Sequence, residues 1–166
     1  MTPQLVAFVL TLWSLIAPGL ERSRDARAIA AALVVAVLED AGGAPVYSSH
    51  LEDLAAGAFT AFRESSLDAS AVGDGERARG PWQLHGPCGL APLPAQARCW
   101  LDLLHRGWAA CPASPMSELW GTCTGRVPYG ARQVDVRLLA GQRERRVRRL
   151  LERAIAPDVG VAERQR

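Results

Sequence analysis

The stretch that most constrains the fold runs from Ala28 to Leu38, where every residue is apolar. A helix without a polar side must be buried on most of its surface. Ser23 is a candidate N-cap for this helix, and Gly42-Gly43 supply the backbone freedom that a helix end needs. We therefore expect a central helix over residues 24–40 with other elements packed around it.

Length and composition fit one globular unit. The chain has 166 residues, of which 49% are apolar, so it can bury a core of its own. The sequence contains no internal repeat, no low-complexity segment and no sign of a second domain. We expect one domain over residues 1–156 and a flexible tail over residues 157–166.

The charge pattern does not indicate a nucleic-acid partner. The formal net charge is only +2, and all 19 basic residues are Arg. Codon bias in a GC-rich genome explains the lack of Lys, so the Arg content is no nucleic-acid signal. The Arg-rich run Arg143 to Arg149 lies on a stretch with an apolar stripe, which favours a packed terminal helix over a surface that binds acidic polymers or membranes.

The apolar run Leu5 to Ala17 is too short to span a bilayer, and Thr11 and Ser14 interrupt it. A signal peptide would need a basic leading segment and a small-residue cleavage site, which this run lacks. We expect a buried first helix here.

Four cysteines, all in the second half, are separated by ten, eleven and eleven residues. This spacing does not match a zinc site, so no metal is expected. Two disulfides in an oxidising compartment suit an even number of well-separated cysteines, whereas a reducing compartment would leave four free thiols. We favour Cys88–Cys99 with Cys111–Cys123, because each of these pairs closes a short loop, although the sequence leaves all three connectivities open.

The remaining segments predict a mainly α-helical domain. Ser49 and Glu52 form a capping box at the start of a helix whose apolar residues recur at steps of three and four. Gly-rich chain follows from Ser65 to Trp82 and is expected to be loop or a short β-hairpin. The expected helices span residues 3–17, 24–40, 49–64, 94–108, 114–120 and 131–154, with further loops at 85–92 and 121–129.

Glu64 is the main candidate for chemistry. It lies at the end of the third helix, on a side whose preceding residues are Gly57, Thr60 and Ala61. Such small side chains would leave open space beside the carboxyl group. A glutamate against apolar walls is disfavoured in its charged form, so it can hold a proton and give it to a leaving oxygen, as glycosidic cleavage requires.

Three short segments resemble one known family. Glu64-Ser65, then LDASAV from Leu67, then ARGPWQL from Ala78, resemble the signature of the transglycosylase SLT family of the lysozyme-like superfamily. The resemblance covers about twenty residues. It implies a lysozyme-like fold, with Glu64 as catalytic acid and base, Ser65 orienting it or contacting an N-acetyl group, and Gln83 lining the cleft.

The resemblance implies a peptidoglycan lytic transglycosylase that breaks the bond between N-acetylmuramic acid and N-acetylglucosamine. One glutamate then acts as acid and base while the substrate's acetamido group and 6-hydroxyl take the place of water. A hydrolytic lysozyme generally adds a second carboxylate, for which Asp74 and Glu76 are candidates. In the segment where the family has a Tyr-Asn pair, this chain has Trp120-Gly121. That departure motivates the alternative of a non-catalytic structural or peptidoglycan-binding protein.

Aromatic side chains could stack on sugar rings, and Trp82, Trp120 and Tyr129 are the candidates, with core packing as the alternative for each Trp. No cofactor is expected. The resemblance further implies a partner in peptidoglycan glycan strands, an extracytoplasmic location (periplasmic, secreted or virion-associated) and a monomer that a larger cell-wall or virion assembly could carry.

Overall fold

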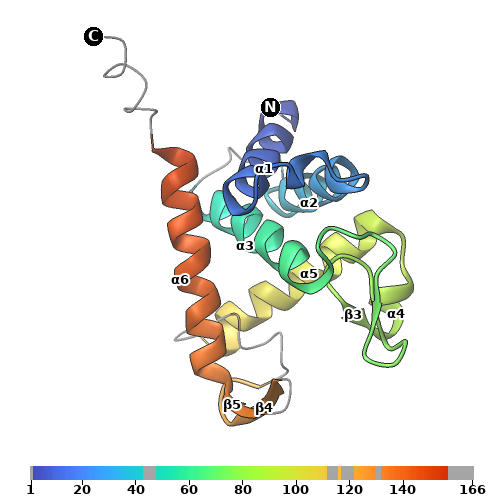
Figure 1. Ribbon diagram of the computed structural model, residues 1–166, viewed down its shortest axis with the longest axis vertical. Coiled ribbons are helices and arrows are strands. Elements are labelled where there is room, and N and C mark those ends of the chain that lie inside the picture. Colours follow the sequence, from blue (N-terminus) through green and yellow to red (C-terminus); the bar gives the residue numbers. More distant parts are fainter. Residues whose placement is uncertain (1, 43–47, 112–115, 117–121, 130–131, 157–166) are drawn as a thin grey trace.

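The computed structural model describes residues 2–42, 48–111, 116, 122–129 and 132–156. The described chain is mainly helical, with two small antiparallel sheets, as the sequence predicts. In Figure 1, helix α6 (Val136–Ile155) runs along one side of the molecule, and the β1–β3 sheet (residues 72–85) with helix α4 (Gly86–Leu90) lies on the other side. No helix within the described ranges is long and apolar enough to cross a membrane.

The central helix predicted from the apolar run is confirmed. Helix α2 spans Ala26–Asp40, and eight of its residues are buried. It packs against α1 (Thr2–Ile16), with the 3-10 turn η1 (Leu20–Arg22) between them. Asp25, rather than Ser23, occupies the N-cap position, and its side chain makes no capping hydrogen bond there.

Helix α3 spans Ser48–Ser65 and carries Glu64 in its last turn. Its small residues do not leave open space, which corrects the prediction. Gly57, Thr60 and Ala61 are buried, and a Cβ at Gly57 would lie 2.6 Å from Leu33 Cδ1 and 3.0 Å from Trp100 Cζ3. Small residues are needed on this side of α3 because neighbouring helices approach closely.

The predicted loop from Ser65 to Trp82 contains a short hairpin, and a third strand follows it. Strands β1 (Val72–Gly73), β2 (Ala78–Arg79) and β3 (Leu84–His85) form an antiparallel sheet. The expected loop at 85–92 also contains a short helix, α4 (Gly86–Leu90). The Cys88–Cys99 disulfide joins α4 to α5 (Leu93–Ala110).

The region before the last helix differs from the prediction. β4 (Arg126–Tyr129) and β5 (Arg132–Asp135) pair in antiparallel fashion where loop and the start of a helix were expected. Helix α6 spans Val136–Ile155 and begins only there, because the Asp135 carboxylate accepts the Arg137 amide at 2.8 Å as an N-cap.

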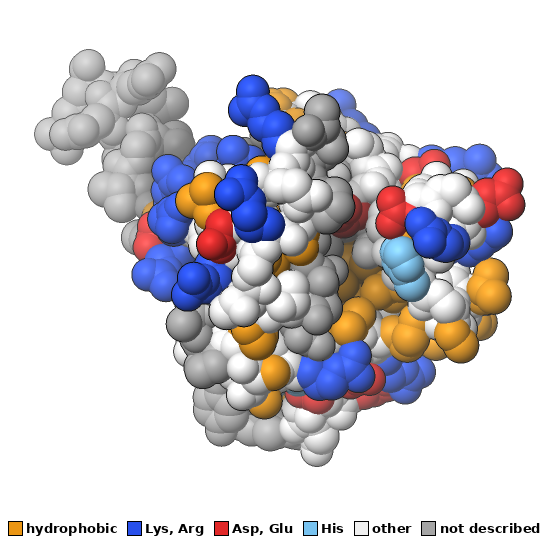
Figure 2. All heavy atoms as spheres, turned by 90° about the horizontal axis from the view of Figure 1, so that it is seen from below, with side chains coloured by type: hydrophobic (Ala, Val, Ile, Leu, Met, Phe, Trp, Pro, Cys, Tyr) orange, Lys and Arg blue, Asp and Glu red, His pale blue; other side chains and the backbone are white. Residues whose placement is uncertain are grey.

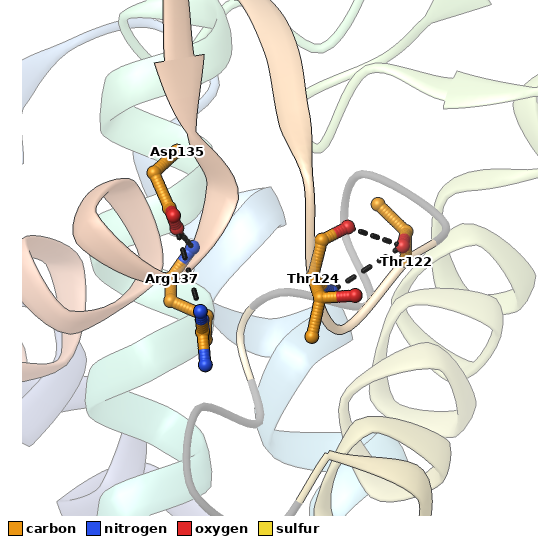
Figure 3. A network of polar contacts seen from close by, with 4 residues as sticks. All are labelled: Thr122, Thr124, Asp135 and Arg137. Carbon is orange, nitrogen blue, oxygen red and sulfur yellow. Dashed lines mark hydrogen bonds and ion pairs between the residues drawn. The ribbon is translucent and has the colours of Figure 1, made fainter.

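A polar network lies beside this hairpin, at the foot of α6 (Figure 3). Thr122 donates its hydroxyl to the Thr124 carbonyl at 2.7 Å, and the Asp135 carboxylate also lies 3.9 Å from Arg137 Nε. The Cys111–Cys123 disulfide joins the residue that follows α5 to the chain just before β4. Both predicted disulfide pairs are therefore confirmed. The helix expected at 114–120 and the expected tail at 157–166 lie outside the described residues.

Candidate active site around Glu64

Glu64 forms a short ion pair with α6. Arg143 places a terminal guanidinium nitrogen 2.6 Å from Glu64 Oε1, and the side chains are 15% and 29% exposed, respectively. The Glu64 side chain is therefore partly exposed, and its carboxyl group is paired with a cation. Sequence reasoning missed Arg143, because one Arg within an Arg-rich helix carries no signal of the distant carboxylate that it meets.

The chain directly after Glu64 adopts unusual backbone conformations. Among the described residues, five other than glycine have positive φ angles, and all five fall between residues 66 and 83. They include Ser66 and Leu67, the two residues directly after Ser65, with φ of 54° and 65°. Such conformations are strained for residues with a Cβ, and they cluster at functional sites when the surrounding structure holds them.

Several contacts hold this strained segment. Asp25 at the start of α2 accepts the Ala69 amide at 3.0 Å. Trp82 donates its indole N–H to the Gly57 carbonyl at 3.1 Å, and its ring stacks on Trp100 with centroids 6.3 Å apart. Gly80 adopts φ +74° with the Gln96 side chain against it, so a Cβ there would clash. The segment is thus anchored to α2, α3 and α5.

Trp82 does not have the role of a sugar platform. It is only 3% exposed, so a sugar ring cannot reach its face, and the structure places it in the core beneath the site. Tyr129 belongs to β4, but its side chain lies outside the described residues, as does all of Trp120.

Ser65 and Gln83, to which the resemblance gives supporting roles beside Glu64, both make hydrogen bonds within their own segments. The Ser65 hydroxyl donates to the Ala61 carbonyl at 2.9 Å, which is a bond within α3. The Gln83 amide donates to the Gly80 carbonyl at 2.9 Å, and its oxygen lies against Gly73. Both side chains are half-buried. Gln83 thus stabilises the β1–β3 sheet, and Ser65 stabilises the last turn of α3.

Both candidate second carboxylates lie in the turn between β1 and β2. Asp74 and Glu76 are exposed there, and Asp74 pairs with His85 of β3 at 3.2 Å. Nearby, hydrogen bonds from Ser70 hold the pKa of Asp68 below its usual range. Asp68 and Asp74 thus make local contacts, and the described contacts do not join any of the three acids to Glu64.

A second carboxylate of α3 was not singled out from the sequence. Asp53 Oδ2 lies 3.1 Å from His105 Nε2 of α5, and the Nδ1 of that His is 3.8 Å from Asp40 of α2. Burial raises the pKa of Asp53, and the hydrogen bond to His105 opposes this only in part. Asp53 directly follows Glu52, which the sequence assigned to a capping box, so nothing in the sequence indicated that Asp53 points inward.

The space-filling view from below shows a furrow between the α6 side and the part formed by the β1–β3 sheet and α4 (Figure 2). Within the described ranges, no group of three or more His, Cys, Asp or Glu side chains could hold a metal ion.

Comparison of the chain with protein-family models, with curated proteins and with solved structures finds no match.

Proposed function

We propose that this protein cleaves peptidoglycan glycan strands as a lytic transglycosylase, with Glu64 as its catalytic acid and base. The supporting observation is the coincidence at the end of α3. A partly exposed glutamate is followed directly by the strained segment, which the core holds in place. Strain of this kind is unfavourable for folding alone, so its position beside the candidate acid favours a catalytic role.

In the proposed reaction, Glu64 first donates a proton to the glycosidic oxygen between N-acetylmuramic acid and N-acetylglucosamine. The bond between the glycosidic oxygen and the anomeric carbon of N-acetylmuramic acid breaks with help from the substrate's acetamido group, and N-acetylglucosamine leaves with the donated proton on its hydroxyl. The Glu64 carboxylate then removes the proton of the muramic 6-hydroxyl as the 6-oxygen attacks the anomeric carbon. An anhydro-sugar end results without a water molecule. Arg143 occupies Glu64 Oε1, so this guanidinium must move aside, or Oε2 must meet the sugar oxygen.

We favour one glutamate over a pair of carboxylates. Asp74 and Glu76 lie in an exposed turn, and Asp74 already pairs with His85. A hydrolytic lysozyme with one of these acids as its partner carboxylate is therefore the less supported form of the same proposal. The two disulfides favour an oxidising location such as a periplasm, a secreted fluid or a virion.

One observation favours a second candidate, a non-catalytic peptidoglycan-binding protein on the same scaffold. The short Glu64–Arg143 ion pair engages the carboxyl group that a catalyst would need. In such a protein the pair would be structural, and glycan strands would bind without turnover. A larger cell-wall or virion assembly could then carry this domain.

The deciding experiment measures soluble products from purified sacculi. We expect Glu64→Gln to lower product release by about 100-fold or more, because a positioned acid contributes about 10²–10⁴ in rate. The matched control Glu76→Gln should keep wild-type activity. Products of the wild type should carry anhydro ends, which are lighter by one water than hydrolysis products. Equal release by Glu64→Gln and wild type would contradict the enzyme proposal.

The Arg143 contact separates the two candidates. If Glu64 is catalytic, Arg143→Gln should change turnover on sacculi while leaving sacculus binding intact. If the protein only binds, neither Arg143→Gln nor wild type will release products, and both will co-sediment with sacculi. Circular dichroism of the variant serves as the folding control.

A further inference from the structure

A second cleft lies between α3, α5 and α6, away from the strained segment. Its volume is about 240 Å³, which is below the range of roughly 300–1,000 Å³ typical of sites for drug-sized ligands. Ala56 lines it, and Glu64 lies eight residues further along α3, about 12 Å at the rise of a helix. The lining consists of Glu52, Asp53, Ala56, Leu104, Trp108, Met116, Glu144, Val147, Arg148 and Leu151.

The lining combines an apolar wall with an excess of negative charge. Three carboxylates, from Glu52, Asp53 and Glu144, share the cleft with one guanidinium, that of Arg148. The other lining side chains are all apolar or aromatic. Carboxylates beside such a wall are poorly hydrated and favour a positively charged neighbour.

The contacts of two of these carboxylates leave room for a further partner. Asp53 Oδ2 meets His105 Nε2 at 3.1 Å, and Glu144 Oε1 accepts the Met116 amide at 3.1 Å. The second oxygen of each has no hydrogen bond within the described part of the chain. Burial raises the pKa of both groups, because the charged form of each is poorly hydrated there.

Trp108 adds an exposed aromatic face. It is 48% exposed although it belongs to the cleft lining. An indole face attracts a cation within about 6 Å of its centroid. An uncharged ligand such as a sugar could stack on Trp108, but it would cover the carboxylates without compensating their charge.

We propose that this cleft binds an ammonium group on an aliphatic stem, either the side chain of a lysine or a free alkylamine. The stem lies along Leu104, Val147 and Leu151, and the ammonium group meets the carboxylates and the Trp108 ring. This site is separate from the Glu64 chemistry, and it stands whether or not the protein cleaves glycans.

The test is a titration of the ¹⁵N-labelled full chain with n-butylammonium, followed by NMR. The Trp108 indole resonance, assigned with Trp108→Phe, should shift in a saturable manner. The isosteric alcohol n-butanol should bind at least about tenfold more weakly, because it lacks the charge-assisted hydrogen bonds. Failure of n-butylammonium to shift this resonance, or equal binding of n-butanol, would overturn the proposal.

Matched variants on α6 locate the site. Glu144→Gln keeps an oxygen for the Met116 amide but removes a charge, so affinity should fall about tenfold. Glu152→Gln, on the same helix but outside the cleft lining, should leave affinity unchanged. Equal affinities for the two variants would contradict the assignment.

Two further arms complete the test. N-acetyl-lysine methylamide binding at least as tightly as n-butylammonium supports a lysine within a peptide, whereas weaker binding supports a small free amine. Affinity should also fall with decreasing pH as the carboxylates gain protons. Asp53 is faced by His105, His50 and Asp40, and Glu144 by Arg148 and Arg145. A pH-independent affinity would contradict charge recognition.

Discussion

Helix α3 carries two carboxylates that make cross-helix ion pairs in very different surroundings. Glu64, at its C-terminal end, is 29% exposed and pairs with Arg143 of α6. The Asp53 side chain, about three turns earlier, is 11% exposed and pairs with His105 of α5. Glu64 precedes a strained segment, whereas regular helices surround Asp53.

The difference shows two ways in which a fold can hold an unfavourable feature. Around Glu64 the unfavourable term is backbone conformation, and contacts from α2, α3 and α5 over-determine it. Around Asp53 the backbone is regular and the unfavourable term is desolvation of a charge. The first arrangement fixes the position of a side chain, and the second leaves a charge that a ligand could compensate.

Trp82→Ala should give the largest effect, because it removes the main support under the Glu64 end. The variant loses a buried indole that packs on Trp100 and its hydrogen bond to the Gly57 carbonyl. We expect destabilisation of about 3–5 kcal/mol in urea unfolding, the usual range for truncation of a buried aromatic residue. The exposed Trp108→Ala is the control and should change stability by about 0.5 kcal/mol or less.

If Trp82→Ala and Trp108→Ala were equally stable, Trp82 would not support the strained segment. The comparison between the two ends of α3 would then lose its structural basis. NMR spectra of Trp82→Ala should also show the largest shifts between residues 66 and 83.

Much of this framework could be predicted from the sequence. The apolar run of α2 required burial whatever lay around it, and the capping box marked the start of α3 to within one residue. Both cysteine pairs follow the short-loop preference. These features depend on local spacing, which a sequence displays directly.

The errors arose where an outcome depends on distant neighbours. Gly57 was interpreted as leaving space beside Glu64, but Leu33 and Trp100 close it. For Trp82 the sequence left both sugar stacking and core packing open, and its burial supports core packing. Arg143 and His105 meet their carboxylates only because α5 and α6 cross α3, and no local pattern indicates that crossing. The proposed role of Glu64 itself is still a prediction.

The two disulfides allow two parts of the structure to be loosened separately. Cys88–Cys99 joins α4 to α5 next to β3, and Cys111–Cys123 follows the end of α5 that carries His105. Their sequence separations of 11 and 12 residues are nearly equal. Chain-entropy estimates therefore give each about 3 kcal/mol, so Cys→Ser replacement of either pair should lower stability by similar amounts.

Hydrogen exchange should separate the two replacements. Loss of Cys88–Cys99 should speed exchange mainly in residues 78–90, and loss of Cys111–Cys123 mainly around residues 104–111. Uniform acceleration in both variants would show that these two regions do not open independently, and they would then belong to one cooperative unit.

Asp53→Asn should give the smallest effect at neutral pH, and its pH dependence is the informative part. Asn can still accept a hydrogen bond from His105, while the desolvation penalty of a buried charge disappears. We therefore expect a stability within about 1 kcal/mol of wild type at pH 7. The control Asp102→Asn, on the exposed face of α5, should be neutral at every pH.

The sign follows from the raised pKa of Asp53. Because the folded protein holds this proton more tightly than the unfolded chain, protonation of Asp53 stabilises the fold. That contribution is complete below the ordinary value of 3.8 and is lost as the pH rises through the higher folded pKa. The stability of wild type minus that of Asp53→Asn should therefore decrease from acid toward neutral pH in urea unfolding. An increase would mean that His105 and His50 favour the charged form of Asp53 despite Asp40. The Asp53 end, like the Glu64 end, would then be an ion pair satisfied within the protein.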